Sequence, residues 1–130
     1  MPEQIKISAI FQVKSKRIYD AWLNGKEHTA MTGASATASN KVGGKFTAWD
    51  GYISGKNLEL HPGQKIVQSW RTTEFPDVAP DSLLEVLLEE SAKGTKVTLI
   101  HSNIPEGQSE SYKAGWKDFY FTPMKEYFKK

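Results

Sequence analysis

The sequence predicts an α+β domain in which a curved antiparallel sheet of about six strands grips a long C-terminal helix. Three patterns predict it. Apolar residues alternate with polar ones near the N-terminus, short apolar runs separated by turn residues fill the middle, and aromatic residues recur at helical spacing near the C-terminus. These elements place their apolar faces in two layers, which is a helix-grip architecture.

The first predicted strand covers residues 5–13, where every second residue is apolar. A period of two indicates a strand with one buried face. Ser15 then stands where a helix N-cap belongs, and apolar residues recur at helical spacing until Asn24 and Gly25 close the segment. We expect a short helix here, with one or two further turns over residues 26–32 and a weakly patterned strand or loop after them.

The middle of the chain predicts a β-meander. Turn signals built from Gly, Asn, Asp and Pro recur along it. They separate predicted strands at residues 45–49, 51–60 and 65–75 and, after a proline-bounded loop, at residues 83–90 and 96–104. Because the connections are too short to hold crossover helices, the strands are expected to be antiparallel.

A long amphipathic helix is predicted over residues 109–128, after Pro105 ends the sheet. Its apolar residues keep helical spacing. They are Tyr112, Trp116, Phe119, Tyr120, Pro123, Met124 and Tyr127. Pro123 lacks an amide hydrogen, so we expect the helix to bend there. Gly115 permits a close backbone approach at some cost in helix propensity.

Length and charge narrow the classes of protein to consider. A chain of 130 residues is long enough for one core and too short for two, so residues 1–130 are predicted to form a single domain. The 17 basic and 15 acidic residues leave a net charge of +2, too weak a field to favour nucleic acid. The chain has no cysteine, which excludes disulfides and thiolate sites.

No targeting or membrane segment stands out. The first residues lack a charged region followed by an apolar stretch, and no apolar run approaches 18 residues. We expect a monomeric cytoplasmic protein that binds neither membrane nor nucleic acid.

No motif identifies a catalytic centre. His28, His61 and His101 show no metal-binding spacing, and no nucleophile elbow or phosphate-binding loop is present. Glu85 and Glu89 share one strand face and are interpreted as solvated surface. We therefore expect no metal, no cofactor and no enzyme, with a cavity enzyme as an open alternative.

The aromatic residues are the candidates for a binding site. They make up 12% of the chain, and four are tryptophans. Bulky aromatic groups with a few polar ones are what an apolar-ligand site is made from, although the same residues can simply fill the core. The candidate cavity residues are Trp49, Trp70, His101, Trp116, Tyr120 and Met124. His101 shares its strand face with Val97 and Leu99 and can equally be a hydrogen-bonded core histidine.

Two blocks of sequence carry a resemblance to a known family. The first comprises Gly43-Gly44-Lys45-Phe46, Trp49-Asp50-Gly51, Gly55-Lys56-Asn57-Leu58-Glu59-Leu60 and Lys65-Ile66-Val67-Gln68-Ser69-Trp70-Arg71. The second comprises His101-Ser102-Asn103-Ile104-Pro105 and Gly115-Trp116-Lys117-Asp118-Phe119-Tyr120-Phe121-Thr122-Pro123. Together they resemble the C-terminal domain of the heat-shock-protein-90 ATPase activators.

The resemblance implies a helix-grip fold of the class that includes START-like, birch-pollen-allergen-like and polyketide-cyclase-like proteins. It also implies a chaperone partner of the heat-shock-protein-90 type. The eukaryotic activators use two domains, and only the second is matched. The loss of one module of a bivalent binder would remove most of its effective concentration and puts chaperone activation in doubt. Three functions stay open: a chaperone-binding module involved in the stress response, a carrier or sensor of a small apolar or lipid-like ligand, and a cavity enzyme of the polyketide-cyclase type.

Overall fold

Within residues 2–129, which the computed structural model describes, six antiparallel strands form one sheet in the order β1-β6-β5-β4-β3-β2. The strands are β1 (Glu3–Phe11), β2 (Lys45–Ala48), β3 (Ile53–His61), β4 (Lys65–Thr72), β5 (Ser82–Ser91) and β6 (Gly94–Ile104). Strands β2 to β6 follow one another as a meander, and β1 adds to the β6 edge.

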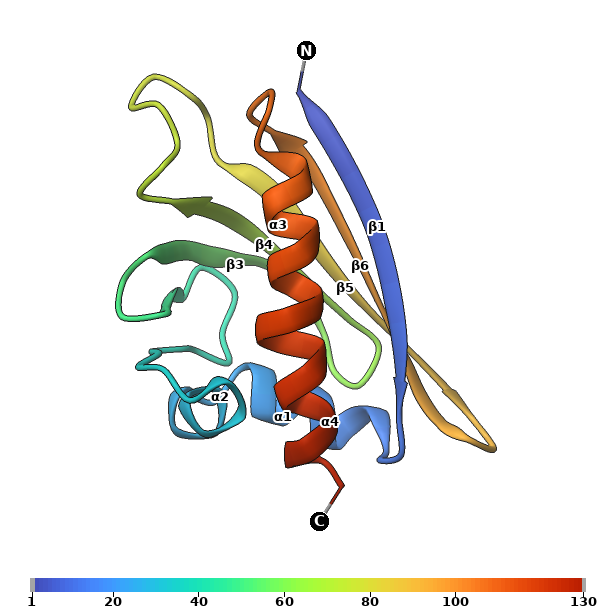
Figure 1. The fold of residues 1–130 in the computed structure, drawn as a ribbon. Coiled ribbons are helices and arrows are strands. Elements are labelled where there is room, and N and C mark those ends of the chain that lie inside the picture. Colours follow the sequence, from blue (N-terminus) through green and yellow to red (C-terminus); the bar gives the residue numbers. More distant parts are fainter. Residues whose placement is uncertain (1, 130) are drawn as a thin grey trace.

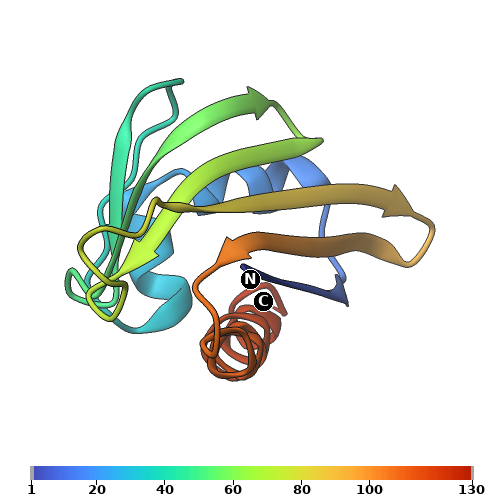
Figure 2. The same ribbon diagram turned by 90° about the horizontal axis from the view of Figure 1, so that it is seen from above.

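Helices cover one face of this sheet. They are α1 (Ser15–Trp22), α2 (Gly25–Thr32), α3 (Ser109–Gly115), the π-helical segment η1 (Trp116–Phe121) and α4 (Thr122–Tyr127). Figure 1 shows α3, η1 and α4 as one long C-terminal helix across the sheet, with α1 and α2 near its C-terminal end. Figure 2 looks along this helix and shows the sheet curving round one side of it. The predicted α+β helix-grip fold is therefore confirmed.

The buried face of the C-terminal helix has an apolar residue at every fourth position. These residues are Tyr112, Trp116, Tyr120, Met124 and Phe128, each at most 7% exposed. On an ideal α-helix a spacing of four drifts by about 40° per step, or about 160° over the series. A π-helical turn contains more residues and corrects that drift. The π-helical segment in the middle thus keeps all five side chains toward the sheet.

The same π-helical segment changes the role of Pro123. It closes with a bond from the Thr122 N–H to the Lys117 carbonyl, and Pro123 falls in the first turn of α4. In the first turn of α4, the absence of an N–H on Pro123 does not remove an α-helical hydrogen bond. The sequence predicted a bend at Pro123, whereas the three segments follow a common axis in Figure 1.

Strand ends differ modestly from the prediction. The largest difference is at β4, which ends at Thr72 rather than at residue 75. The loop before β2, predicted as a strand or loop, contributes only an isolated bridge between Thr37 and Thr47. Val97, Leu99 and His101 share one buried face of β6, as their spacing predicted.

The caps of the two short helices differ from the prediction. Asn24 does not end a helix but begins α2, where its side chain accepts a hydrogen bond from the Glu27 N–H at 3.0 Å. Ser15 is the first residue of α1, and its N–H and hydroxyl both donate to the Glu90 carboxylate of β5, at 2.8 and 2.9 Å. A residue 75 positions away therefore caps α1, and these bonds lower the pKa of Glu90.

We expect Glu90→Ala to lower the melting temperature, because it leaves the N–H and the hydroxyl of Ser15 at the start of α1 without this acceptor. The neighbouring Glu89→Ala removes the same charge from β5 and is the matched control. Thermal unfolding followed by circular dichroism measures both. Equal melting temperatures for the two variants would show that the cap contributes nothing.

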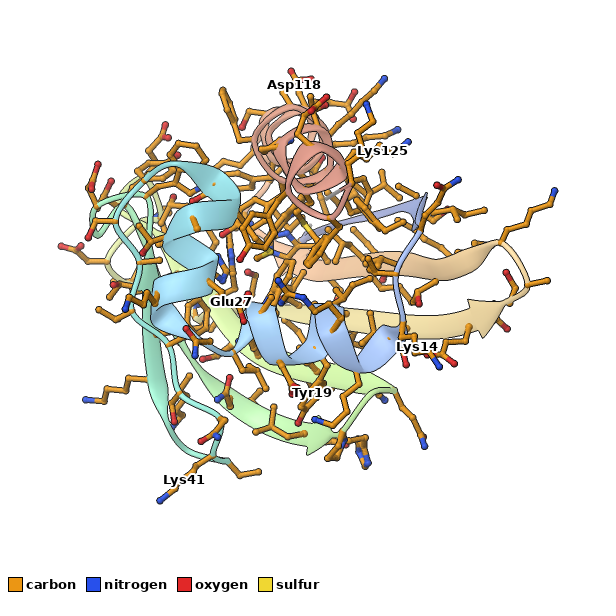
Figure 3. The ribbon with its side chains drawn as sticks, turned by 90° about the horizontal axis from the view of Figure 1, so that it is seen from below. Lys14, Tyr19, Glu27, Lys41, Asp118 and Lys125 are labelled. Carbon is orange, nitrogen blue, oxygen red and sulfur yellow. The ribbon has the colours of Figure 1, made fainter. Side chains whose placement is uncertain are left out.

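Side chains fill the space between sheet and helices. Figure 3 shows them converging there, while Lys125 and Asp118 point outward from the C-terminal helix. Every buried side-chain nitrogen or oxygen of residues 2–129 has a hydrogen-bond partner. The helices in this range are all too short or too polar to span a membrane.

Candidate functional site

A pocket of about 460 Å³ lies between the C-terminal helix and the end of the sheet formed by β2, β3 and β4. Aromatic side chains make up most of its wall. The lining residues are Trp49, Tyr52, Ile53, Trp70, Glu74, Ser111, Tyr112, Gly115, Trp116, Phe119 and Tyr120. A pocket of this volume suits a small organic molecule.

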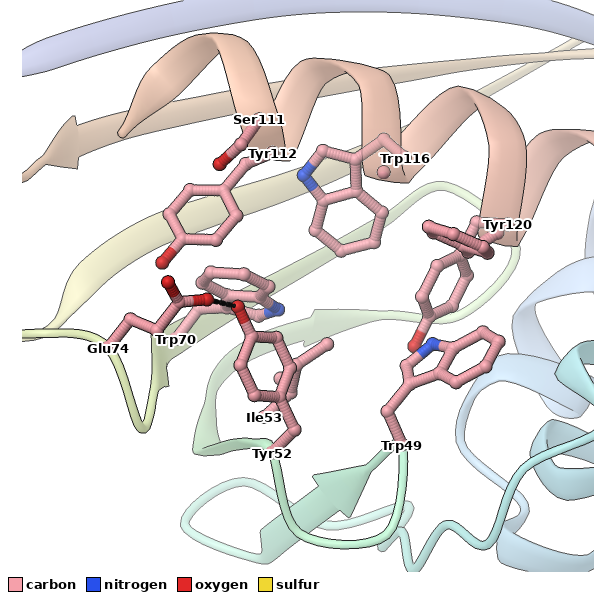
Figure 4. A pocket seen from close by; sticks show the side chains of 11 residues that line it. Trp49, Tyr52, Ile53, Trp70, Glu74, Ser111, Tyr112, Trp116 and Tyr120 are labelled. Carbon is pink, nitrogen blue, oxygen red and sulfur yellow. Dashed lines mark hydrogen bonds between the residues drawn. The ribbon is translucent and has the colours of Figure 1, made fainter. Parts of the chain in front are cut away.

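Four parts of the chain build the pocket: the C-terminal helix, the sheet, the turn between β2 and β3, and the loop after β4, which contributes Glu74. The C-terminal helix contributes Tyr112, Trp116 and Tyr120 at successive steps of four residues. Sheet residues and the turn between β2 and β3 supply the opposite wall. Figure 4 shows Glu74 and Tyr52 at one end and Trp49 and Tyr120 at the other.

The rings pack against one another as well as against the pocket. Trp116 lies 5.5 Å from Trp70 and 4.8 Å from Tyr120 between ring centroids. At the rim, Phe119 meets Trp49 edge to face at 5.4 Å and is 56% exposed. Contacts between rings at these distances stabilise the wall without a ligand, so the pocket is preformed.

The turn that holds Trp49 is in an uncommon conformation. Trp49 and Asp50 have φ angles of +52° and +59°, and Gly51 follows at +92°. A bulky residue rarely adopts positive φ, and such strain concentrates at functional sites. Two hydrogen bonds join Asp50 and Ser35, one from each backbone N–H, and hold the turn in place.

Most polar groups of the pocket are engaged in hydrogen bonds within the protein. The Tyr52 hydroxyl donates to the Glu74 carboxylate, and burial raises the pKa of Tyr52. The Tyr112 hydroxyl donates to Gln108 at 2.6 Å and lies 2.7 Å from the Thr72 hydroxyl. Among the described lining residues, Glu74 is the one that carries a carboxylate.

His101 supports the pocket from behind. The Trp116 indole donates to Nδ1 of His101 at 3.1 Å, so the imidazole hydrogen is on Nε2 and points to Ser82 Oγ at 2.7 Å. Ser82 in turn donates to the Trp70 carbonyl at 2.6 Å. Burial lowers the pKa of His101 to about 3. The neutral ring thus orients two tryptophans of the wall.

His28 plays the corresponding part at the other end. Its Nδ1 lies 3.0 Å from the Trp22 carbonyl, which can only accept, so Nε2 accepts from the Tyr120 hydroxyl at 2.7 Å. Burial lowers the pKa of His28. Nothing in the local sequence singles out this histidine, because its partner Tyr120 lies 92 residues away.

The six predicted cavity residues divide into two groups. Trp49, Trp70, Trp116 and Tyr120 line the pocket. His101 and Met124 are fully buried and do not line it. That any of the six binds a ligand stays a prediction.

Gly115 lies on the pocket wall and has no tight neighbour. A methyl group there would be 3.9 Å from the Phe119 ring, its nearest contact outside the helix backbone. The close backbone approach expected at this glycine is therefore absent, and the missing side chain leaves room in the pocket.

We expect Gly115→Ala to raise the free energy of unfolding by about 0.5–1 kcal/mol, because alanine restricts the unfolded chain and fits the helical backbone. Urea denaturation measures the change. An unchanged or lower value would mean that this position requires glycine for a reason other than helix propensity.

Residues 2–129 contain no group of three or more His, Asp or Glu side chains placed to hold a metal ion. The exposed pair Asp81 and Arg71 forms an ion pair at 2.8 Å, and Glu85 pairs with Lys65 at 3.6 Å. These carboxylates therefore lie in surface ion pairs.

Comparison with known proteins places the chain in a family. A family model described as activator of Hsp90 ATPase homologue 1-like protein matches residues 12–129. A Dictyostelium discoideum protein named activator of 90 kDa heat shock protein ATPase homologue is 31% identical over 87% of this chain and 30% of its own length. The human homologue 1 is 26% identical over 96% of this chain and 37% of its own length.

The chain thus spans about a third of the length of these curated relatives. A solved structure described as an HSP90 activator from Plasmodium falciparum superposes with a TM-score of 0.84 at 26% identity. That alignment covers 92% of this chain and 91% of the solved one.

Proposed function

Since the chain belongs to the family of activator of Hsp90 ATPase homologue 1-like proteins, we propose that it binds an Hsp90-type chaperone and stimulates its ATPase. The observation that carries the proposal is the match over nearly the whole domain. The Plasmodium structure described as an HSP90 activator is covered over 91% of its solved chain, so a domain with this fold bears that description.

The proposed binding is weak and sensitive to salt. The curated relatives are about three times as long as this chain, and a bivalent binder that loses one module loses most of its effective concentration. Exposed loop residues and basic side chains are the proposed contacts. Val78 is 95% exposed and Val42 is 65% exposed, which makes these loop residues suitable probes of an interface.

The test is the steady-state ATPase of the Hsp90-type chaperone from the same organism, titrated with this protein at low salt. A saturable rise supports the proposal. Val78→Asp and Val42→Asp should leave folding intact, as surface changes usually do, and loss of stimulation in one of them would locate the contact. No rise in rate and no NMR shift on mixing would refute it.

A second candidate function is the binding of a small hydrophobic ligand in the pocket, as a carrier or sensor. The preformed aromatic wall and the volume of about 460 Å³ favour it. A neutral aromatic compound should raise the melting temperature in a concentration-dependent way. In Gly115→Leu, the new side chain would occupy part of the pocket, and the shift should disappear.

We propose that neither function involves catalysis. Among the described residues that line the pocket, Ser111 carries an aliphatic hydroxyl but donates to the Gln108 carbonyl at 3.0 Å, and none of these lining residues is a histidine or a lysine. A nucleophile needs an adjacent base. That the protein is a cytoplasmic monomer stays a prediction.

A further inference from the structure

We propose that the pocket selects organic cations over neutral and anionic molecules of similar shape. The class of cation is an aromatic ammonium or a quaternary ammonium compound. This inference rests on the second proposed function, that a small molecule enters the pocket. It names the class of ligand, which the fold alone leaves open.

The wall is a cage of aromatic rings. Seven of its eleven residues are aromatic, and they surround the space from the helix, the sheet and the turn between β2 and β3. The seven are Trp49, Tyr52, Trp70, Tyr112, Trp116, Phe119 and Tyr120. The face of an aromatic ring has a negative electrostatic potential and attracts a cation within about 6 Å. The attraction is strongest for tryptophan.

The charge of the pocket has the matching sign. Glu74 is the one charged side chain that the described residues place on its wall, and no lysine, arginine or histidine lies there. Lys113 and Lys117 belong to the same helix but line a different groove, together with Ile7 and Ala9 of β1. A cation would meet a carboxylate, and an anion would meet a like charge.

The hydrogen bonds favour the same class. Tyr52 supplies one hydrogen bond to the Glu74 carboxylate, which has about four acceptor positions and so keeps capacity for a ligand. The Tyr112 and Tyr120 hydroxyls donate to Gln108 and His28, and the Trp116 indole donates to His101. These groups are therefore not available as donors to an anion.

The strained turn gives an independent reason to regard this end as functional. Trp49 has a φ of +52°, a conformation that a bulky residue holds only when the surrounding structure enforces it. Its ring lies at the end of the pocket opposite Glu74 in Figure 4. An elongated cation could place its charged group beside Glu74 and its apolar part beside Trp49.

The experiment compares three probes of similar size. They are (4-hydroxyphenyl)trimethylammonium, its neutral isostere 4-tert-butylphenol, and the anion 4-tert-butylbenzoate. Binding is followed by the ¹H–¹⁵N signals of the indole groups, with those of Trp49, Trp70 and Trp116 as reporters. Trp22 is buried and does not line the pocket, but it packs against Trp116 at 6.2 Å between ring centroids, so its signal should shift less than those of the three reporters.

We expect the cation to bind about tenfold more tightly than its neutral isostere, the order of difference that cation–π contact supplies, and the anion to bind most weakly. Glu74→Gln should reduce the preference for the cation while leaving the affinity for 4-tert-butylphenol unchanged. Asp77→Asn, the same charge change in the same loop but outside the pocket, should leave the preference intact.

Three results would overturn the inference or its charge argument, and they differ in what else they affect. If the neutral probe binds as tightly as the cation, the pocket takes small molecules without selecting cations. If Glu74→Gln keeps the full preference, Glu74 is not the group that selects the cation and the charge argument fails. If no probe shifts the three reporters at millimolar concentration, the proposed ligand function fails together with this inference.

Discussion

Trp70→Ala should lower the free energy of unfolding by about 3–5 kcal/mol, the range for truncating a buried aromatic side chain. Trp70 is 3% exposed, and its ring lies 4.5 Å from His101, 5.1 Å from Tyr112 and 5.5 Å from Trp116. Removing it takes away a common neighbour of the three. The expected loss is a large part of the stability of a domain of this size.

Trp49→Ala is the matched comparison, because it removes the same side chain from the same pocket. Trp49 is only half-buried, and its ring contact is with the exposed Phe119. We expect Trp49→Ala to lower the free energy of unfolding by about 1 kcal/mol or less. Both variants should weaken binding of any pocket ligand, so the pair separates packing from ligand contact.

Urea denaturation measures the loss of unfolding free energy in each variant, and an unchanged m-value shows that the loss is one of stability. A small loss in Trp70→Ala would mean that the neighbouring rings close the space that the indole leaves. Equal losses in both variants would contradict the division of the wall into a packed part and a rim.

Local patterns were sufficient to predict the fold. The alternation in β1 and the spacing of four in the C-terminal helix report directly which face is buried, because burial repeats with the period of the element. The same reasoning placed His101 on the buried face of β6, and the structure has it fully buried.

Contacts between residues that are far apart in the sequence could not be predicted from local patterns. Ser15 has the side chain of an N-cap, and nothing near it indicates that Glu90 takes that role from another strand. The π-helical segment is a further case, since a spacing of four is ordinary over two turns and drifts only when it is sustained.

The pocket shows a similar division. Trp49, Trp70, Trp116 and Tyr120 were predictable because large aromatic residues dominate the inner face of a helix grip. Glu74 was not, since it lies in an irregular loop after β4, where no period indicates the direction of a side chain. The residue that sets the charge of the pocket is therefore the one that required the structure.

The two buried histidines predict how stability depends on pH. Each holds its position as a neutral ring: His101 accepts from the Trp116 indole, and His28 accepts from the Tyr120 hydroxyl. Protonation would turn each accepting nitrogen into a donor facing a donor. Burial accordingly lowers the pKa of His101 to about 3 and lowers that of His28, from the ordinary value of 6.5.

The contribution of the neutral histidines to the free energy of unfolding should be fully present above pH 6.5. It should decrease as the pH falls toward 3. In that window the unfolded chain binds a proton on each histidine that the folded protein does not, so acid favours unfolding. The limiting slope is about 1.4 kcal/mol per pH unit for each histidine. His101 alone should cost about 2 kcal/mol at pH 5 relative to pH 8.

Urea denaturation between pH 8 and pH 5 isolates this effect, because the carboxylates with lowered pKa, Glu3, Glu27 and Glu90, titrate in the unfolded chain near 4.5 and act mainly below pH 5. His101→Gln should be less stable at pH 8 but should lose part of the slope. His28→Gln should remove a further part. If the slope persists undiminished in both variants, the neutral histidines behind the pocket wall are not the groups that make acid unfold this protein.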